Sequence, residues 1–549
     1  MNNSKKKVAL LSNIATDLIV AKLCRKYDLY VPDGFDTWVQ DVISTSSNFY
    51  RESLDAIVLL LDGTEARKWK NSDEGFERLS LWKSAINFVL SNISSIPIFI
   101  TTIDVRENRI KSLSERKFSL EFANDWYQFI QKKAEESNNV YVIDLADSIY
   151  DVGRNNFYSN KLWYMSSMPY SRIGLNLVSL EISRALDSAF LSRKKIIALD
   201  LDNTLWGGVI GEDGFDGVEL SEHKEGQRYY DFQRQLIEMK NRGILLAINS
   251  KNNKIDTEQI INNHPAMLLR ENDFVCQRIN WENKATNLKS IEQDLNITEG
   301  GFIFIDDNPV ERETVKGECP DCYVPDFPSD TTELLSFAEN IWFDYCRPLR
   351  VLGEDLKKTK MYQNEVKRKQ DKSVSLNLDD YIKKLKINID IHRMKPNELE
   401  RVVQLINKTN QFNVTTKRYS LAEINELSNN KMNSIYVVHS SDKYGDYGLI
   451  SVVILKRSKN EVYIDLFLMS CRVMGRKLEF VIFNEIFSQE KMLIKAEYVP
   501  SPKNEPVKDL FDKLGFRLIS DDGHKKYEMS PKDYEYKKFD CFNEIKFDF

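Results

Sequence analysis

The stretch that decides the fold of the central region is IIALDLDNTL, residues 196–205. Its four apolar residues, 196–199, predict a strand buried on both faces, and Asp200 and Asp202 follow it directly. In an open parallel sheet, ligands bind outside the carboxyl ends of the strands. One carboxylate there can attack phosphorus, while the other protonates the leaving oxygen and later activates water. The stretch therefore predicts a phosphoryl-transfer site.

Three later segments repeat this pattern. A lone Asp-x-Asp is often only a turn, but a hydroxyl, an amine and an acidic pair in this order together favour a site. Several carboxylates at one place repel each other, and Mg²⁺ resolves that repulsion. The side chains concerned are Asn249 and Ser250 after a predicted strand at 244–248, Lys284 at a predicted helix start, and Asp306 and Asp307 after a predicted strand at 302–305.

The rest of the chain predicts flanking domains. Residues 1–192 alternate short apolar runs with helical patterns, which indicates a parallel, doubly wound sheet. The alternation restarts after a charged break and continues over 193–345. Residues 353–375 are dense in Lys, Glu and Gln, and 346–375 are predicted to form a solvated helical linker. Residues 376–549 mix strands, at 435–439, 449–455 and 462–467, with a helix at 478–487, which predicts an α+β domain.

Composition excludes several classes of protein. A net charge of −6 leaves no basic footprint for nucleic acid, and no apolar run is long enough to cross a membrane. The apolar run near the N-terminus is too short for a signal peptide. Seven scattered cysteines argue against a disulfide framework and favour a reducing, cytoplasmic location.

Two possible metal signals in the sequence are weak. Cys319 and Cys322 form a CxxC without a second pair, so a tight loop is favoured over zinc. The five histidines show no metal spacing, and core or surface roles are expected for them. His439, at a predicted strand end, is a candidate base, although a core or surface role is favoured for it too.

The order Asp-x-Asp, Ser, Lys, Asp-Asp resembles the haloacid dehalogenase (HAD) superfamily. Many HAD enzymes carry a cap domain, but residues 205–243 and 251–283 are too short for one. The glycine-rich segment 206–214 predicts a β-hairpin flap, and an uncapped site admits a large substrate. The resemblance implies a nucleophile at Asp200, an acid/base at Asp202, phosphate binders at Ser250 and Lys284, and Mg²⁺ on Asp200, the Asp202 carbonyl and Asp306, with Asp307 close by.

A longer set of motifs resembles the FkbH-like family, HAD subfamily IIIC, over essentially the whole chain. The motifs are LDLDNTLWGGVIGEDG at 199–214, IDDNPVER at 305–312, NKTNQFN at 407–413 and LMSCRVMGR at 468–476. The resemblance implies an α/β protein: an SGNH-like, flavodoxin-type N-terminal domain, a capless Rossmann-like HAD domain and an α+β GNAT-like (acetyltransferase-like) C-terminal domain.

Family members in polyketide pathways load the glyceryl group of 1,3-bisphosphoglycerate onto the phosphopantetheine thiol of an acyl carrier protein and remove phosphate. The resemblance therefore implies a phosphorylated small-molecule donor and a carrier-protein partner. Two alternatives stay open: a capless phosphatase on another substrate, with the flanking domains as binding modules, or a non-enzymatic carrier-protein adaptor.

The N-terminal domain departs from active SGNH hydrolases. Their Asp-x-x-His segment corresponds to 166–169 here, where Ser166 and Pro169 stand at the Asp and His places. Ser12, after the first predicted strand, is the candidate nucleophile, but a serine needs a base to activate it. A docking or structural role is therefore expected for this domain.

The C-terminal domain carries part of a GNAT phosphate-binding turn. Arg472 and Gly475 match its first two anchors, whereas Lys477 replaces the final small residue. Arg472 and Arg476 can still meet the phosphate of a pantetheine arm or a phosphoglycerate. Cys471 stands beside Arg472 near a helix start and is a candidate to hold an acyl group, the alternative being a buried core residue.

Overall fold

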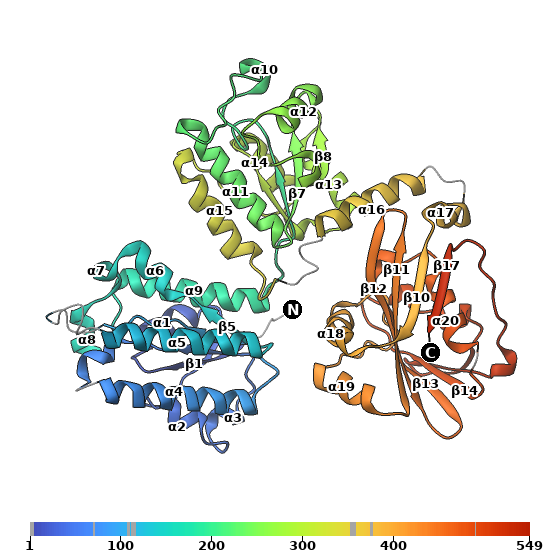
Figure 1. The fold of residues 1–549 in the computed structure, drawn as a ribbon, viewed down its shortest axis with the longest axis horizontal. Helices are drawn as coiled ribbons and strands as arrows, with labels where there is room; N and C mark the ends of the chain where they lie inside the picture. The colour runs from blue at the N-terminus through green and yellow to red at the C-terminus, as the bar shows by residue number, and fades with distance from the viewer. Residues whose placement is uncertain are drawn as a thin grey trace. The chain divides into compact units, whose positions relative to one another are not determined.

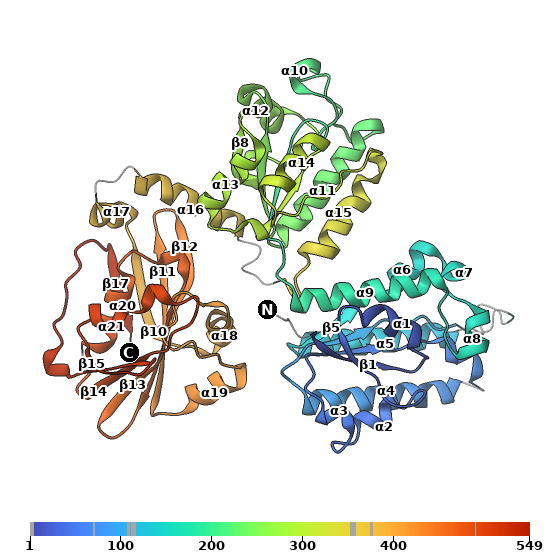
Figure 2. The ribbon, with the colours of Figure 1, turned by 180° about the vertical axis from the view of Figure 1, so that it is seen from behind.

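The computed structural model describes residues 5–69, 72–106, 110, 117–351, 358–373, 377–488 and 490–548. Figures 1 and 2 show the ribbon from two opposite sides. The chain folds into two compact units, one made of Met1–Ile244, Gln259–Leu269 and Glu299–Leu356, the other of Leu245–Glu258, Arg270–Thr298 and Lys357–Phe549.

The N-terminal part of the first unit is a five-stranded parallel sheet in the order β2-β1-β3-β4-β5. This is the flavodoxin-like order, so the predicted doubly wound sheet is confirmed. The strands are β1 (Lys7–Ser12), β2 (Asp28–Tyr30), β3 (Ala56–Leu60), β4 (Ile98–Thr101) and β5 (Val140–Ile143).

Helices cover both faces of this sheet (Figure 1). One face packs against α1 (Asp17–Leu23) and α9 (Arg172–Phe190), and the other against α4 (Ser72–Asn92) and α5 (Lys117–Glu136). Each face therefore buries its own apolar core. Shorter helices complete the layers: α2 (Trp38–Val42), α3 (Asn48–Arg51), α6 (Leu145–Val152), α7 (Arg154–Phe157) and α8 (Asn160–Ser166).

The first unit also contains the strands that carry the acidic motifs. β6 (Ile196–Leu199) and β9 (Phe302–Ile305) pair in parallel, and all of their residues are buried. Both strands have the predicted bounds. The helices around them are α10 (Ile210–Asp213), α11 (Gln227–Asn241), α14 (Pro309–Glu318) and α15 (Leu334–Ile341).

The predicted hairpin flap over 206–214 is wrong. This segment contains the short helix α10, and the only antiparallel contact that we find in it is a single bridge between Gly207 and Glu219. The carboxylate of Asp213 accepts from the Val209 N–H at 2.7 Å and so closes the helical turn. Within residues 200–244, all of which the structure describes, no cap domain is inserted.

The second unit begins with the parallel strands β7 (Leu245–Ser250) and β8 (Phe274–Ile279). Helix α12 (Lys254–Asn263) follows β7, and α13 (Lys284–Leu295) follows β8. The α/β alternation predicted for this region is confirmed.

The C-terminal domain is built on an eight-stranded sheet in the order β15-β16-β14-β13-β12-β11-β10-β17. Most neighbours are antiparallel, whereas β13–β14 and β10–β17 are parallel, so the predicted α+β character is confirmed. The strands are β10 (Asn388–Arg393), β11 (Asn433–Asp442), β12 (Gly445–Arg457), β13 (Glu461–Met469), β14 (Leu493–Tyr498), β15 (Arg517–Asp521), β16 (Lys525–Met529) and β17 (Glu544–Asp548).

Two apolar cores flank the C-terminal sheet. One face packs against α17 (Leu378–Leu385), α20 (Leu478–Phe487) and α21 (Leu510–Lys513). The other face packs against α18 (Leu399–Lys408) and α19 (Leu421–Asn429). Among the helices of the described part of the chain, none is both long and apolar enough to cross a lipid bilayer.

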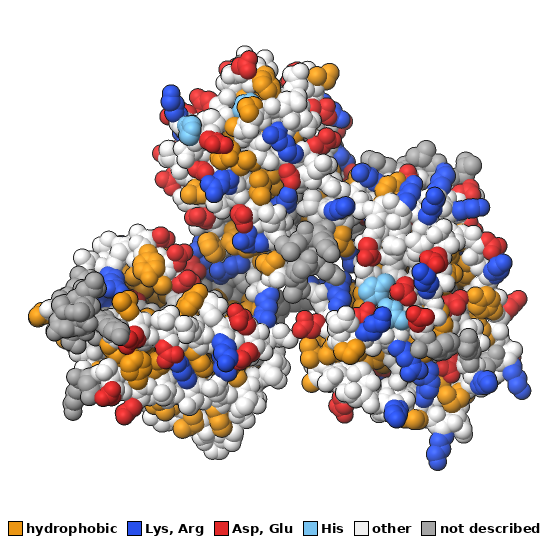
Figure 3. Space-filling model, in the orientation of Figure 1, with side chains coloured by type: hydrophobic (Ala, Val, Ile, Leu, Met, Phe, Trp, Pro, Cys, Tyr) orange, Lys and Arg blue, Asp and Glu red, His pale blue; other side chains and the backbone are white. Residues whose placement is uncertain are grey.

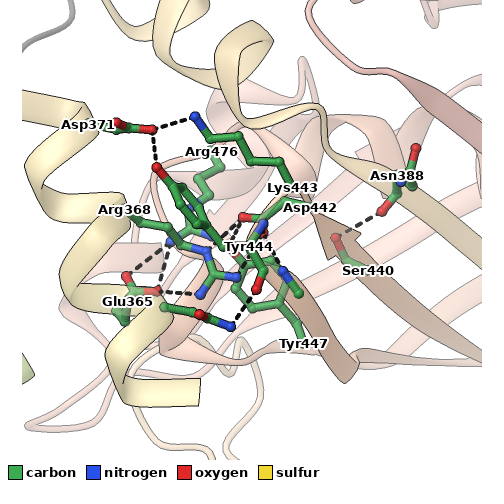
Figure 4. Close-up of polar contacts among 12 residues, drawn as sticks. Glu365, Arg368, Asp371, Asn388, Ser440, Asp442, Lys443, Tyr444, Tyr447 and Arg476 are labelled. Atoms are coloured by element: carbon green, nitrogen blue, oxygen red, sulfur yellow. Dashed lines mark hydrogen bonds and ion pairs between the residues drawn. The ribbon is translucent and has the colours of Figure 1, made fainter. Parts of the chain in front are cut away.

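Helix α16 (Lys358–Ser373) confirms the predicted helix but not its solvated character. On one side, the Gln363 amide donates to the carbonyl oxygens of Asn272 and Phe274, both at 2.9 Å. On the other, buried Arg368 donates twice to the Asp442 carboxylate, at 2.7 and 2.8 Å (Figure 4). Polar pairing therefore fixes a helix that has few apolar anchors.

Candidate functional site

Three acidic side chains converge at the carboxyl ends of β6 and β9. Asp200, Asp306 and Asp307 each offer one oxygen, and these oxygens all lie within 4.8 Å of one another. Asp200 and Asp306 are buried, and Asp307 is half-buried. The Asp200 N–H donates to the Ile305 carbonyl at 2.9 Å, which continues the strand pairing to the first aspartate. The predicted meeting of the two acidic motifs is confirmed.

The turn after β6 holds Asp202 through one carboxylate oxygen. The indole N–H of fully buried Trp206 donates to Asp202 Oδ1 at 2.9 Å, and the Ile210 N–H donates to the same oxygen at 3.2 Å. Asn203 adopts a left-handed φ of 52°, and its side-chain oxygen accepts from the Gly208 N–H at 2.9 Å. The segment after the aspartates thus positions the acid/base candidate, a role that the sequence pattern did not show.

The turn after β9 is fixed by a helix cap and an arginine. Asn308 caps α14, because its side-chain oxygen accepts from the Val310 N–H at 2.9 Å, and Pro309 occupies the first turn. Arg312 donates to the carbonyl oxygens of Asp306 and Asp307, at 2.9 and 2.6 Å. Arg312 and this cap were not predicted, although the Asn-Pro start of a helix is a recognisable signal.

This group of carboxylates fits a hard divalent cation. Burying a carboxylate is unfavourable unless a partner or a metal compensates its charge. Mg²⁺ prefers oxygen ligands from one or two carboxylates, leaving room for substrate phosphate and water. Two buried aspartates and a half-buried one, with oxygens this close, offer that donor set. A contact from the backbone carbonyl of Asp202 remains a prediction.

The predicted phosphate binders Ser250 and Lys284 lie in the second unit, where both are buried. Asn249 donates to the Lys284 carbonyl at 2.9 Å and accepts from the Asn287 amide at 3.1 Å. Asn283 caps α13 through the Ala285 N–H at 2.7 Å. Asn249 is fully buried and its amide holds the first turn of α13, so it supports Lys284, and its predicted contact with substrate stays a prediction.

A cavity of about 280 Å³ in the second unit brings together the four candidate residues of the C-terminal domain. Helix α16 forms one wall, and the segment after β13 forms another. From that segment come Cys471, Arg472, Met474, Gly475 and Arg476, and from α16 come Met361, Tyr362, Asn364, Glu365, Arg368 and Lys369.

Arg476 does not offer a free charge to this cavity. Its guanidinium is buried, donates to the Tyr447 hydroxyl, and donates to both Glu365 carboxylate oxygens at 3.1 and 3.3 Å (Figure 4). The predicted phosphate contact of Arg476 therefore has to compete with Glu365. Arg472 is half-buried and approaches only Ser470 Oγ, at 3.3 Å, and Met361 Sδ, at 3.8 Å, in the contacts that we resolve for it.

The turn itself has the backbone that its sequence implies. Gly475 has a φ of +74°, and Lys477, which replaces the expected small residue, has a φ of 61° directly before α20. The Lys477 ammonium pairs with Asp379 at 2.6 Å. Cys471 is exposed, so the alternative of a buried core cysteine is wrong.

The N-terminal domain places Ser12 at the carboxyl end of β1. Its hydroxyl is buried, donates to the Leu60 carbonyl at 2.7 Å and accepts from the Ile14 N–H at 3.3 Å. Ser166 donates to the Leu162 carbonyl at 3.1 Å, within α8. These contacts support the turns around Ser12 and Ser166, and the sequence supplies no histidine before His223.

Two smaller sequence expectations have different outcomes. The Cys322 N–H donates to the Cys319 carbonyl at 3.0 Å, which confirms the tight loop. The histidines show no metal spacing along the sequence, yet the fold brings His392 and His439 together with Glu398, with their ligand atoms within 4.8 Å of one another.

Comparison with known proteins supports the fold. No protein-family model and no curated protein matches this chain. The N-terminal part of the protein BF1531 from Bacteroides fragilis, which contains a phosphatase domain and was crystallised in complex with Mg, is 24% identical, with a TM-score of 0.56. The match covers 63% of this chain and 95% of that chain, and it shows a shared α/β fold.

Acetyltransferases match a smaller part. The ribosomal-protein-S18-alanine N-acetyltransferase from Escherichia coli is 9% identical over 26% of this chain and 90% of its own, with a TM-score of 0.20. An acetyltransferase from Thermus thermophilus is 14% identical over 26% of this chain and 98% of its own, with a TM-score of 0.21.

Proposed function

We propose that this chain is a Mg²⁺-dependent phosphatase of the HAD type, coupled to transfer of an acyl group onto a carrier-protein thiol. The observation that carries the proposal is the convergence of Asp200, Asp306 and Asp307 at two adjacent strand ends. Asp202 is fixed by Trp206 in the turn directly after Asp200. The fold shared with a phosphatase-containing protein that binds Mg supports this assignment.

Asp200 and Asp202 have different roles in the proposed reaction. The Asp200 carboxylate attacks phosphorus and forms an aspartyl phosphate, while the leaving oxygen takes a proton from Asp202. Because Asp202 Oδ1 accepts from Trp206 and Ile210, the transferable proton belongs on Oδ2. Asp202 then takes a proton from water, the water oxygen attacks phosphorus, and inorganic phosphate leaves with Asp200 regenerated.

The metal and the cationic side chain act on charge. Mg²⁺ held by Asp200, Asp306 and Asp307 would neutralise charge on the phosphoryl oxygens. Ser250 and Lys284 are assigned to the phosphoryl group by their places at the end of β7 and at the start of α13. The Asn249 amide holds Lys284 in that place by donating to the backbone carbonyl of Lys284.

Acyl transfer is assigned to the cavity beside Cys471. Met361, Tyr362 and Met474 give it apolar walls suited to a pantetheine arm, and Arg472 offers a cation for the arm's phosphate. With 1,3-bisphosphoglycerate as donor, the Cys471 thiolate attacks the acyl carbon, a C–S bond forms, and the acyl phosphate leaves as inorganic phosphate. The carrier thiol then takes the acyl group, and the aspartate site removes the remaining phosphate ester.

The absence of an inserted domain between the described residues 200 and 244 suits a protein-borne substrate. A cap encloses a small molecule, whereas an open site admits an acyl group that is still attached to its carrier. The proposed partner is therefore an acyl carrier protein that presents its phosphopantetheine arm.

Intact mass spectrometry of the carrier tests the proposal. The full-length protein, Mg²⁺, 1,3-bisphosphoglycerate and a holo carrier protein should give a glyceryl adduct on the carrier. Asp200→Asn should stop hydrolysis of the phosphate ester and leave a heavier phosphoglyceryl adduct. Cys471→Ala should give no adduct, and an adduct of normal yield would remove this thiol from the mechanism.

A second candidate is a phosphatase that acts on another phosphorylated substrate, with the C-terminal domain as a binding module. The pairing of Arg476 with Glu365 favours it, since this pair withholds one cation from the cavity. Phosphate release without any carrier adduct would identify this second function.

A further inference from the structure

Two histidines and a glutamate meet on the C-terminal sheet, away from the cavity described above. His392 lies on β10, His439 on β11, and Glu398 ends the short turn Pro396–Glu398 before α18. In the antiparallel register of these strands, His439 pairs with Asp390. Asp390 precedes His392 by two residues, so the three side chains lie on the same face of the sheet. Histidine side chains are visible together on the surface of this domain in Figure 3.

The three side chains point their ligand atoms at one another. Glu398 Oε1 lies 3.1 Å from His392 Nε2 and 3.0 Å from His439 Nε2. The two imidazole rings are nearly parallel, at 13°, with centroids 5.4 Å apart. All three ligand atoms fall within 4.8 Å of one another.

These distances suit Zn²⁺ or a similar divalent transition-metal ion. Zinc binds histidine nitrogen and carboxylate oxygen at about 2.0–2.2 Å, so tetrahedral donors stand roughly 3.3 Å apart. To admit an ion, the two distances between Glu398 Oε1 and the histidine nitrogens would have to widen by a few tenths of an ångström. Two imidazoles and one carboxylate also form a donor set that occurs at zinc sites.

The surrounding contacts orient the ligands. The other Glu398 oxygen accepts from the Lys395 N–H at 2.8 Å, which fixes the carboxylate. His392 Nδ1 is buried and lacks a hydrogen bond in the described structure, although Asp390 Oδ1 is 3.5 Å away. If His392 carries its proton on Nε2 and donates it to Glu398, the lone pair of Nδ1 faces the Asp390 carboxylate.

A metal at Nε2 removes that conflict. It places the ring proton on Nδ1, where it can donate to Asp390, as in the carboxylate–histidine–metal arrangement of many zinc sites. The side chain of His439 is 34% exposed, so solvent reaches the cluster and can supply a fourth ligand. On the neighbouring strand, Asp548 stands directly opposite His392.

We propose that His392, Glu398 and His439 form a second metal site, for a divalent transition metal of the zinc class. His392 and His439 bind through Nε2, Glu398 binds through Oε1, and water completes the shell. Asp390 orients His392 as a positioning residue. The site joins β10, β11 and the start of α18, and it is independent of the aspartate site.

Cobalt(II) absorption tests this site in the full-length protein. The Asp200→Asn/Asp306→Asn variant serves as background, because it removes two acids of the other metal site. After EDTA treatment and buffer exchange, one equivalent of Co²⁺ should give the visible bands of a tetrahedral, imidazole-bound ion, and Zn²⁺ should abolish them. No such bands would overturn the proposal and leave a hydrogen-bonded or protonated cluster as the explanation.

Three single substitutions in this background locate the ion. His439→Gln should abolish the bands, and Asp390→Asn should weaken binding about 10- to 100-fold. His524→Gln, which changes another exposed histidine, should leave binding unchanged. Zn²⁺ should also raise the melting temperature of the background protein but not of the His439→Gln protein. Normal binding by folded His439→Gln protein would refute the assignment.

Discussion

The buried ion pair between Arg368 and Asp442 should determine how firmly α16 closes the cavity beside Cys471. The side chains are 3% and 0% exposed, and the pairing is bidentate at 2.7 and 2.8 Å. Arg368→Met removes the charge, both hydrogen bonds to Asp442 and a longer contact with Glu365 at 3.4 Å. It keeps a side chain that can pack against the Tyr447 ring, which lies 4.2 Å from the guanidinium.

The expected loss of stability follows from burial. Breaking a buried pair typically costs about 3–5 kcal/mol, because the remaining charge loses its partner. Asp442 keeps three donors, the Tyr447 hydroxyl at 2.6 Å and the N–H groups of Tyr444 and Gly445 at 2.9 and 3.2 Å. We therefore expect a loss near the lower limit, about 3 kcal/mol.

Hydrogen exchange of α16 in the full-length protein measures this loss locally. A loss of about 3 kcal/mol corresponds to protection roughly 150-fold lower. The matched control is Lys443→Met, which breaks the more exposed Lys443–Asp371 pair on the same hairpin, where the side chains are 35% and 30% exposed (Figure 4). That change should cost less than about 1 kcal/mol. Equal protection in the two variants would refute the reasoning.

The remaining predictions concern the acidic turn and pH. Trp206→Phe removes a hydrogen bond to Asp202 Oδ1 that is worth about 1.5–3 kcal/mol. The kcat for phosphate release should therefore fall roughly 10- to 150-fold. An unchanged kcat in folded protein would contradict the role of Trp206 in positioning Asp202. Asn203→Ala should be less stable to urea than Asn203→Gly by about 1 kcal/mol, because alanine disfavours a φ of 52°; equal stability would exclude that strain. Burial tends to raise the pKa of Asp442, but hydrogen bonds from Arg368 and Tyr447 outweigh it and hold that pKa below its ordinary value. The Asp442 contribution to stability is therefore complete above the ordinary aspartate pKa and is lost as the pH falls toward the lower, folded value. Urea unfolding from pH 7 to pH 3 should show this decline in the wild type, and a fall of the same steepness in Asp442→Asn would contradict it.

Strand ends could be predicted from the sequence because buried parallel strands are short apolar runs. β6 and β9 have the predicted bounds, so the meeting of Asp200 with Asp306 and Asp307 followed from the alternation of strands and helices. The flap was wrong because glycine-rich residues fit both a hairpin and a short helix. Two hydrogen bonds favour the helix α10, one from the Val209 N–H to Asp213 and one from the Ile210 N–H to Asp202. They form only in the folded turn, so the sequence pattern did not show them.

Polar long-range pairing explains what the sequence did not show. Helix α16 lacks an apolar stripe, so periodicity gave no sign that Arg368 pairs with Asp442, 74 residues away. The cluster of His392, Glu398 and His439 depends on the register between β10 and β11, and β10 was not among the predicted strands. Local sequence patterns cannot predict such contacts, because each residue taken alone is of a polar type that usually lies at the surface.

The most direct test of the central assignment is phosphate release by Asp200→Asn protein in the presence of Mg²⁺. The substitution keeps the size of the side chain and removes the attacking carboxylate, so release should fall more than about a thousandfold. Asp326→Asn, at a side chain that is 88% exposed, is the matched control and should release phosphate at the wild-type rate. Wild-type release by folded Asp200→Asn protein would contradict the assignment of Asp200 as the nucleophile.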